Sequence, residues 1–262
     1  MDLFLRDRVI LVTGGSSGVG LATLRLLAGE GALLATCARD GERLQKALAD
    51  AGIAGDRVLA STCDVRIPQE VAALVAAVTD RFGRLDGLVN NAGQSRMKTL
   101  EQTTADDWRD ELDLKFAGVL NPTNASLPWL RRSGAAAIVN VNAILAVQPE
   151  PRLAATSAAR AGLLNLSRTM ADAYAPDGIR VNSVCLGLVD TGQWRRRYER
   201  AGTVHDYATW QRDLAADRRV PLGRLGTPEE VAAVIAFLLS GRASYITGSA
   251  IDVGGGVGRG IH

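Results

Sequence analysis

The stretch Val9-Ile10-Leu11-Val12-Thr13-Gly14-Gly15-Ser16-Ser17-Gly18-Val19-Gly20 decides the fold of this chain. Residues 8–13 are mostly apolar and β-branched, which predicts a buried strand, and helical spacing of apolar residues follows over 19–28. Between the two, Gly14 permits a tight turn, Gly18 lets the backbone approach a pyrophosphate, and Gly20 lets the helix pack closely on the strand. A phosphate would bind the free N–H groups at the positive end of the helix dipole. A plain turn is the alternative, but strand, turn and helix follow in the required order, which favours a dinucleotide site. Its predicted contacts are Gly14, Ser16, Ser17, Gly18, Val19 and Gly20.

Outward from this stretch, strand and helix patterns alternate to the end of the chain, with short connections and no internal repeat. Such alternation predicts the α/β class, as a single-domain Rossmann-type fold over 1–262. Its sheet would be parallel and doubly wound, flanked by helices, with right-handed crossovers. The predicted strands are 8–13, 32–38, 58–62, 88–90, 136–142, 179–186 and 250–253. The predicted helices are 19–28, 42–51, 68–82, 106–130, 154–174 and one that begins at 228.

Bulk composition excludes several classes of protein. A chain of 262 residues with 47% hydrophobic content and a mean hydropathy near zero is typical of a globular protein with a large core. Apolar runs fall short of the roughly 20 residues that a membrane span needs. The charged N-terminus does not resemble a secretory signal, and a net charge of only +2 argues against a nucleic-acid interface, which needs clustered basic residues.

The three cysteines, Cys37, Cys63 and Cys185, lie far apart in the sequence. Their spacing fits neither a CxxC motif nor a metal site, so we predict no metal. Two of them fall in apolar strand patterns. Buried reduced thiols, and therefore a cytoplasmic location, are the expectation.

Residues 190–220 are the exception to the short connections. A long insertion at the carboxyl end of a strand is where α/β proteins place substrate lids, so we expect a lid here. Guanidinium groups beside an aromatic wall suit a small-molecule substrate with a carboxylate or phosphoryl group, including an acyl-thioester carrier. A solvated helix face is the alternative, because charge runs usually face water. The first part of the insertion holds Trp194, Arg195, Arg196, Arg197, Tyr198 and Arg200; Trp194, Arg196 and Arg200 are the predicted substrate contacts.

The spacing TGxxxGxG at Thr13 to Gly20 resembles the short-chain dehydrogenase/reductase family, and the resemblance extends over nearly the whole chain. It continues at Cys63-Asp64-Val65, Asn90-Asn91-Ala92-Gly93, Ile179-Arg180-Val181-Asn182, Leu186-Gly187 through Thr191, and Thr247-Gly248. The family implies a nicotinamide dinucleotide cofactor and an oxidoreductase acting on a carbonyl or alcohol. It also implies a homo-oligomer, dimer or tetramer, to which the tail 254–260 contributes.

The resemblance assigns further cofactor contacts. It implies that Asp64 and Val65 meet the adenine, and that Val189 and Thr191 hold the nicotinamide carboxamide. Asn91, Ala92 and Gly93 would line the ribose side.

The end of the second strand distinguishes NADP from NAD. A carboxylate there would accept a hydrogen bond from the ribose 2′-OH of NAD, whereas this chain has Ala38 followed by Arg39. An arginine is suited to hold the 2′-phosphate of NADP. Asp40 could instead compete for Arg39, and Arg39 could be one of many surface arginines. NADP is the predicted cofactor, with NAD as the alternative.

The family's catalytic Asn-Ser-Tyr-Lys set is replaced. Aligned on the fifth strand and the helix after it, the Tyr and Lys positions hold Thr156 and Arg160, the Ser position holds Ala143 and the Asn position holds Lys115. No YxxxK occurs anywhere in the chain. An aliphatic hydroxyl is a far weaker acid than a phenol, so Thr156 alone cannot supply the proton near neutral pH.

Three interpretations of this replacement stay open. The protein is an oxidoreductase that uses substitute groups such as Lys115, Thr156 or a lid tyrosine (Tyr198, Tyr207); or a silent cofactor-binding subunit of an active homologue; or a module that senses the dinucleotide. Lys115 close to Arg160 would have a lowered pKa and could act as a general acid or base. Alternatively Lys115 fills space and reaches a backbone carbonyl or an acid such as Asp113.

Overall fold

The opening stretch folds as its sequence predicts. In the computed structural model, which describes residues 2–259, β1 (Val9–Thr13) is buried along its whole length, and α1 (Gly18–Gly29) follows after a four-residue turn, 14–17. The turn needs glycine at two places because Gly14 has a φ of +75° and Gly18 a φ of +55°. The strand, turn and helix therefore form a rigid corner at the carboxyl edge of the sheet.

All seven strands pair in parallel in one sheet of order β3-β2-β1-β4-β5-β6-β7. The order reverses between β1 and β4, which is the switch point where doubly wound folds bind ligands. The predicted α/β Rossmann-type fold is thereby confirmed. The other strands are β2 (Leu33–Ala38), β3 (Val58–Thr62), β4 (Gly87–Asn90), β5 (Ala137–Ala143), β6 (Arg180–Leu186) and β7 (Ala250–Val253).

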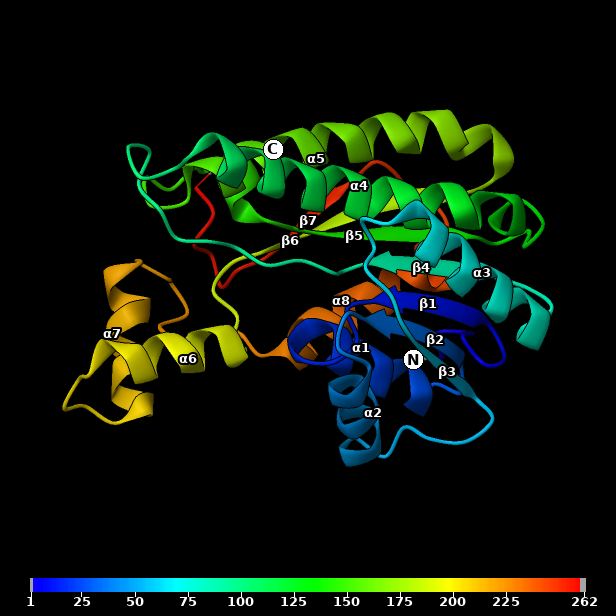
Figure 1. Cartoon of the computed structure of the whole chain (residues 1–262), viewed down its shortest axis with the longest axis horizontal. Coiled ribbons are helices and arrows are strands. Elements are labelled where there is room, and N and C mark those ends of the chain that lie inside the picture. The colour runs from blue at the N-terminus through cyan, green and yellow to red at the C-terminus, as the bar shows by residue number, and fades with distance from the viewer. Residues whose placement is uncertain (1, 260–262) are drawn as a thin grey trace.

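Helices cover both faces of the sheet (Figure 1). One apolar core forms between the sheet and α1, α2 (Gly41–Asp50) and α8 (Pro228–Leu239). A second core forms between the opposite face and α3 (Pro68–Phe82), α4 (Ala105–Leu130) and α5 (Ala154–Tyr174). Short 3₁₀ turns occur at η1 (Ile144–Ala146), η2 (Ala175–Asp177) and η3 (Gly241–Ala243). Predicted and observed ends differ by about one residue, as is usual for fraying termini.

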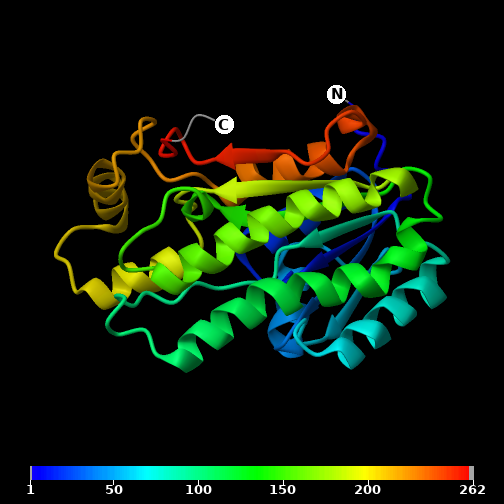
Figure 2. The same ribbon diagram turned by 90° about the horizontal axis from the view of Figure 1, so that it is seen from above.

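The 190–220 insertion folds into two short helices, α6 (Gly192–Ala201) and α7 (Tyr207–Asp217). Figures 1 and 2 show both helices beyond the carboxyl ends of the strands, projecting from the body of the molecule. The predicted self-association tail is described through Arg259, and Gly260 lies outside the described residues.

Within residues 2–259, no helix is long and apolar enough to cross a membrane. The same residues contain no cluster of side chains that could hold a metal ion. Cys37, Cys63 and Cys185 are buried free thiols.

Asp86, at the start of β4, ties three parts of the sheet together. Its buried carboxylate accepts hydrogen bonds from the Val9 backbone N–H (2.9 Å), from the Arg84 guanidinium (2.7 and 2.8 Å) and from the Ser133 hydroxyl. Burial alone would raise the pKa of Asp86, but these donors outweigh it and hold the pKa below its usual value. The charged carboxylate therefore stabilises the alignment of β1, β4 and the turn before β5.

We expect Asp86→Asn to lower the free energy of unfolding at pH 7 by about 1–3 kcal/mol, the usual cost of losing hydrogen bonds to a charged group. Urea denaturation with an unchanged m-value measures it. Because the folded pKa is depressed, this contribution is present above roughly pH 4 and disappears as the pH falls through the folded pKa. Asp56→Asn is the matched control, since Asp56 is exposed and lies 3.7 Å from Arg81. Equal losses in the two variants would contradict the assignment.

Candidate active site

A long cleft opens at the carboxyl edge of the sheet, across the switch point between β1 and β4. Its volume is about 1260 Å³, which exceeds the roughly 300–1,000 Å³ of most single-ligand pockets and leaves room for a dinucleotide and a substrate together. The α1 turn lines one end, α4 and α5 line the middle, and α6 lines the other end.

The phosphate end is built from backbone. Ser17 is the N-cap of α1 but makes no side-chain cap, and the first turn of α1 contains no acid. In contrast, α2, α4, α7 and α8 are each capped by a side chain. The free N–H groups of α1 therefore remain available for a pyrophosphate. Of the six predicted contacts, five line the cleft: Gly14, Ser16, Ser17, Gly18 and Val19.

Gly20 has a different part. It is buried and is not among the residues that line the cleft. A Cβ at Gly20 would lie 2.3 Å from the Gly14 carbonyl oxygen, so glycine is required there for close packing of α1 beneath the turn.

Thr13 and Asn91 join the ends of β1 and β4. The Thr13 hydroxyl accepts from the backbone N–H groups of Asn91 and Ala92, each at 3.0 Å. The Asn91 side-chain amide donates to the carbonyls of Thr13 (2.9 Å) and Gly14 (3.1 Å). The Asn91 amide is thus used in shaping the turn, while Asn91, Ala92 and Gly93 line the cleft where the ribose side was predicted.

The adenosine end carries three arginines. Arg39 is exposed and lines the cleft, and Asp40 does not compete for it, because Asp40 caps α2 by accepting from the Arg43 N–H at 2.9 Å. Arg43, in the first turn of α2, lines the same end and was not among the predicted contacts. Asp64 binds Arg66 in bidentate fashion, and Asp64 and Val65 both line the cleft.

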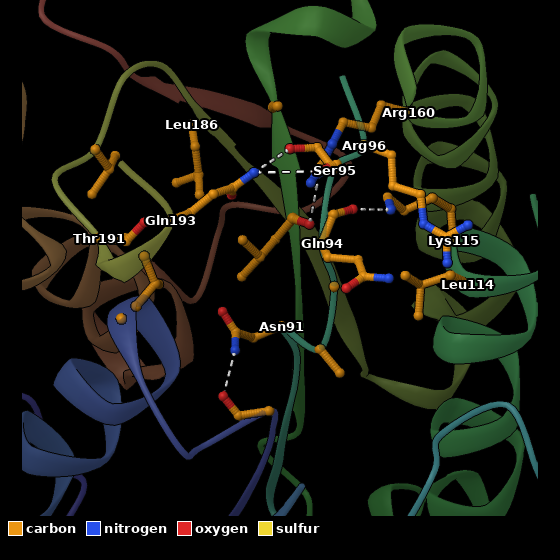
Figure 3. A pocket seen from close by; sticks show the side chains of 18 of the residues that line it. Asn91, Gln94, Ser95, Arg96, Leu114, Lys115, Arg160, Leu186, Thr191 and Gln193 are labelled. Atoms are coloured by element: carbon orange, nitrogen blue, oxygen red, sulfur yellow. Dashed lines mark hydrogen bonds between the residues drawn. The ribbon is translucent and has the colours of Figure 1, made fainter. Parts of the chain in front are cut away.

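At the predicted nicotinamide end, Val189 and Thr191 line the cleft after β6. Val189 forms an isolated bridge with Gly226, which holds the backbone in place. Gln193, at the start of α6, donates to the Ser95 hydroxyl at 2.9 Å, and Figure 3 shows this contact spanning the cleft. The α6 helix is therefore fastened to the loop after β4.

Lys115 is buried in the wall of the cleft, on α4. Its Nζ donates to the Gln94 carbonyl at 2.9 Å (Figure 3). It also donates to Glu111 Oε2 at 3.2 Å. Burial first, and then the charge of Arg160, lower the pKa of Lys115 to about 8, although Glu111 acts in the opposite direction. Arg160 is thus close enough to affect Lys115 by its charge, as predicted. The contacts with a backbone carbonyl and an acid also match the structural alternative, with Glu111 in place of Asp113, which is exposed.

The other replaced positions differ from one another. Ala143 ends β5 and lines the cleft, and so does Arg160, whose Nε has no hydrogen-bond partner among the described residues. Thr156 is 1% exposed, its hydroxyl has no partner in the described chain, and it is not among the cleft-lining residues. The short Thr side chain therefore stays inside the α5 packing, where a longer side chain would extend outward.

The insertion contributes a cationic wall. Trp194, Arg196 and Arg200 line the cleft as predicted, and so do Arg197, Arg218 and Glu150, which were not among the predicted contacts.

The two tyrosines of the insertion bind other groups of the insertion. Tyr207 donates to Asp190, and burial followed by this hydrogen bond raises the pKa of Tyr207 to about 12. Tyr198 donates to the His205 carbonyl at 3.0 Å. Neither tyrosine lines the cleft in this arrangement.

A family model described as Enoyl-(Acyl carrier protein) reductase matches residues 14–258, and curated short-chain reductases align over nearly the entire chain. The chain belongs to the short-chain dehydrogenase/reductase family. It is 40% identical to cis-4-hydroxycyclohexanecarboxylate dehydrogenase of Sinomonas cyclohexanicum, over 95% of this chain and 96% of that protein. It is 34% identical to the 3-oxoacyl-[acyl-carrier-protein] reductase FabG of Thermotoga maritima, over 97% and 98%.

Solved structures of this family agree with the fold. A short chain oxidoreductase from Pseudomonas aeruginosa PAO1, bound to NADPH and described as containing an atypical catalytic center, superposes with a TM-score of 0.93. It is 50% identical, over 98% of this chain and 100% of that one. L-sorbose reductase from Gluconobacter frateurii, complexed with NADPH and L-sorbose, also gives 0.93, at 32% identity over 100% of both chains.

Placement of Arg39 predicts a cofactor preference. We expect NADPH to bind more tightly than NADH, and Arg39→Ala to weaken NADPH by about 10- to 100-fold while leaving NADH unchanged, because one charge-assisted contact with the 2′-phosphate is lost. Fluorescence titration of both cofactors measures this. Arg25→Ala, outside the cleft, is the control. Equal weakening of both cofactors by Arg39→Ala would refute the assignment.

Proposed function

We propose that this protein is an NADP-dependent oxidoreductase that interconverts a carbonyl and an alcohol, with Lys115 as the proton-transferring group. The observation that carries the proposal is a buried ammonium in the cleft wall with two of its three donors occupied. Gln94 and Glu111 take those two, which leaves one N–H for a substrate oxygen. A pKa of about 8 allows Lys115 to give or take a proton near neutral pH.

The residues present fit a dinucleotide. Free N–H groups at α1, glycine at two positive-φ positions and Arg39 beside Arg43 match diphosphate and 2′-phosphate groups. Bound there, NADPH would supply the hydride. Arg160, which lines the cleft, would donate to ribose hydroxyls. It stays charged and cannot relay a proton.

In the reducing direction, protonated Lys115 donates its third N–H to the substrate carbonyl oxygen. The oxygen gains negative charge as the carbonyl carbon accepts the hydride, and the proton moves from Nζ to that oxygen. Lys115 is then neutral, beside Arg160 and Glu111, and regains a proton from solvent. In the oxidising direction neutral Lys115 takes the alcohol proton. Thr156 has no part in this sequence because it does not line the cleft.

A silent cofactor-binding subunit is the second candidate. The observation that favours it is the loss of the family's donors: Ala143 offers none, and the Thr156 hydroxyl is enclosed in the α5 packing. A dinucleotide sensor is the third candidate, and it too needs only a cofactor site without a proton donor. Both alternatives predict cofactor binding without turnover by the purified chain.

The substrate is proposed to be a small molecule with an acid group, covered by α6 and α7 as a lid. The arginines that these helices add to the cleft support this. A relative at 40% identity acts on a hydroxycyclohexanecarboxylate, and another at 34% on 3-oxoacyl-[acyl-carrier-protein]. The atypical catalytic center of the Pseudomonas relative supports a non-standard proton donor.

The pH dependence follows from the Lys115 pKa of about 8. Reduction needs the protonated form, so kcat/KM for reduction should be constant below about pH 7 and fall as the pH rises through 8. Oxidation needs the neutral form and should rise over the same range. Glu111→Gln removes a charge that raises the pKa of Lys115, so both limbs should move to lower pH. Initial rates in both directions, measured as a function of pH, test this. If the two pH profiles of Glu111→Gln match those of the wild type, Lys115 is not the titrating group.

Lys115→Met should lower kcat for reduction by about 100-fold or more, the usual contribution of a positioned proton donor. NADPH affinity should change little. Steady-state assays against a panel of ketones, with parallel titration of NADPH, measure both quantities. Lys46→Met is the matched control, because Lys46 is exposed on α2. Full turnover in Lys115→Met would refute the mechanism, and a wild type that turns over none of the panel would favour the silent subunit.

A further inference from the structure

The lid end of the cleft has more positive than negative charge. Four cleft-lining arginines lie there, and among the described residues only one of them, Arg218, has a salt bridge. The other three make no side-chain hydrogen bond or salt bridge with any part of the chain between 2 and 259; they are Arg196, Arg197 and Arg200. Arg66 and Arg96, elsewhere in the cleft, are paired with acids. Among the described residues, the cleft arginines whose side chains make neither a hydrogen bond nor a salt bridge are therefore those at the predicted adenosine end and those on α6.

Burial separates Arg197 from its neighbours. Arg196 and Arg200 are exposed, so water and salt screen their charges. Arg197 is half-buried, and its guanidinium carbon lies 4.3 Å from the centre of the Trp194 ring. Burial lowers the pKa of Arg197, Glu150 acts to raise it and Arg218 acts to lower it, so these three groups lie within electrostatic reach of one another.

Glu150 is already committed to Arg218. The Arg218 Nη1 lies 2.5 Å from Glu150 Oε1, and both side chains are less than one-third exposed. Arg218 Nε also lies 3.5 Å from Asp217 Oδ2, but Asp217 is exposed, so water and salt screen that contact. Glu150 is the half-buried carboxylate beside Arg218. Arg197 stacks on an aromatic ring but has no acceptor for its planar set of donors.

We propose that Arg197 and Trp194 form a subsite for the carboxylate of the substrate, with the Arg218–Glu150 pair as its fixed wall. The inference rests on the proposed function, because it assigns the far end of the same substrate. A planar carboxylate matches the planar donors of the Arg197 guanidinium. Its single charge would meet less repulsion from Glu150 than the charge of a phosphate dianion. The sequence predicted Arg196 and Arg200 as the substrate contacts. The proposal assigns the carboxylate instead to Arg197, whose guanidinium packs on the Trp194 ring.

Direct binding tests the subsite without turnover. Isothermal titration calorimetry on the protein saturated with NADP would use cyclohexanecarboxylate, 4-oxocyclohexanecarboxylate and a straight-chain 3-oxo acid as probes, each beside its methyl ester. Arg197→Met should weaken carboxylate binding by about 10- to 100-fold and leave the esters unchanged. Arg195→Met is the matched control, since Arg195 lies 3.7 Å from the Tyr207 ring centre and does not line the cleft. Unchanged melting temperature and NADPH affinity establish that the variants are folded.

A charge test adds a second arm. Glu150→Gln raises the local charge by one, so the preference for a carboxylate over phosphonate analogues of the same probes should fall at least several-fold.

No carboxylate binding by the wild type, or equal losses in Arg197→Met and Arg195→Met, would overturn the subsite. Carboxylates that bind at Arg197 without any turnover would instead overturn the proposed function and leave the subsite standing. Turnover of neutral ketones without carboxylate binding would overturn the subsite and leave the proposed function standing.

Discussion

Hydrogen bonds between Thr13 and Asn91 join the ends of β1 and β4, the two strands between which the order of the sheet reverses. Parallel strands end at one edge, and because the order reverses between β1 and β4, no crossover helix covers the gap between them. The Thr13 hydroxyl accepts from two N–H groups of the β4 loop, and the Asn91 amide binds two carbonyls of the β1 turn. Two backbone N–H groups and two carbonyls at the reversal are thereby satisfied. This end of the cleft is consequently lined by backbone in fixed positions.

The middle of the cleft depends instead on side chains, and there the physics is electrostatic. Gly162 brings α5 against α4 so closely that a Cβ would lie 2.7 Å from the Phe116 ring, and this places Arg160 beside Lys115. Two buried cations would be costly. Glu111, one turn before Lys115 on the same helix, offsets part of that cost. The family relies on a phenol acidified by a neighbouring lysine. Here Lys115, at the family's Asn position, has its pKa lowered to about 8 by burial and by Arg160.

The sequence predicts the fold and the cofactor end well because both rest on local patterns. Gly14 and Gly18 are required by the turn itself, and NADP, predicted from Arg39, agrees with the NADPH-bound relatives. The pairing of Lys115 with Arg160 came from the family resemblance, while Glu111 was missed although its i,i+4 spacing is a local signal. The burial of Thr156 could not be predicted, since it depends on how α5 packs. Nor could Arg197 be chosen over Arg196: adjacent helical residues point in different directions, and only the docked helix shows which of them meets Trp194.

The two ends of the proposed substrate site act on each other through charge. A carboxylate bound at Arg197 would add a negative charge to a cleft whose middle wall holds Arg160 and Lys115. A negative charge favours a protonated ammonium, so binding of the acid substrate would raise the pKa of Lys115, and its release would lower the pKa again. Carbonyl reduction uses the protonated lysine, so binding of the acid group would itself prepare the proton donor. A neutral ketone would lack this effect even if it entered the cleft. In such a site the charge of the substrate would contribute to catalysis as well as to recognition, because the same carboxylate would bind Arg197 and favour the protonated form of Lys115.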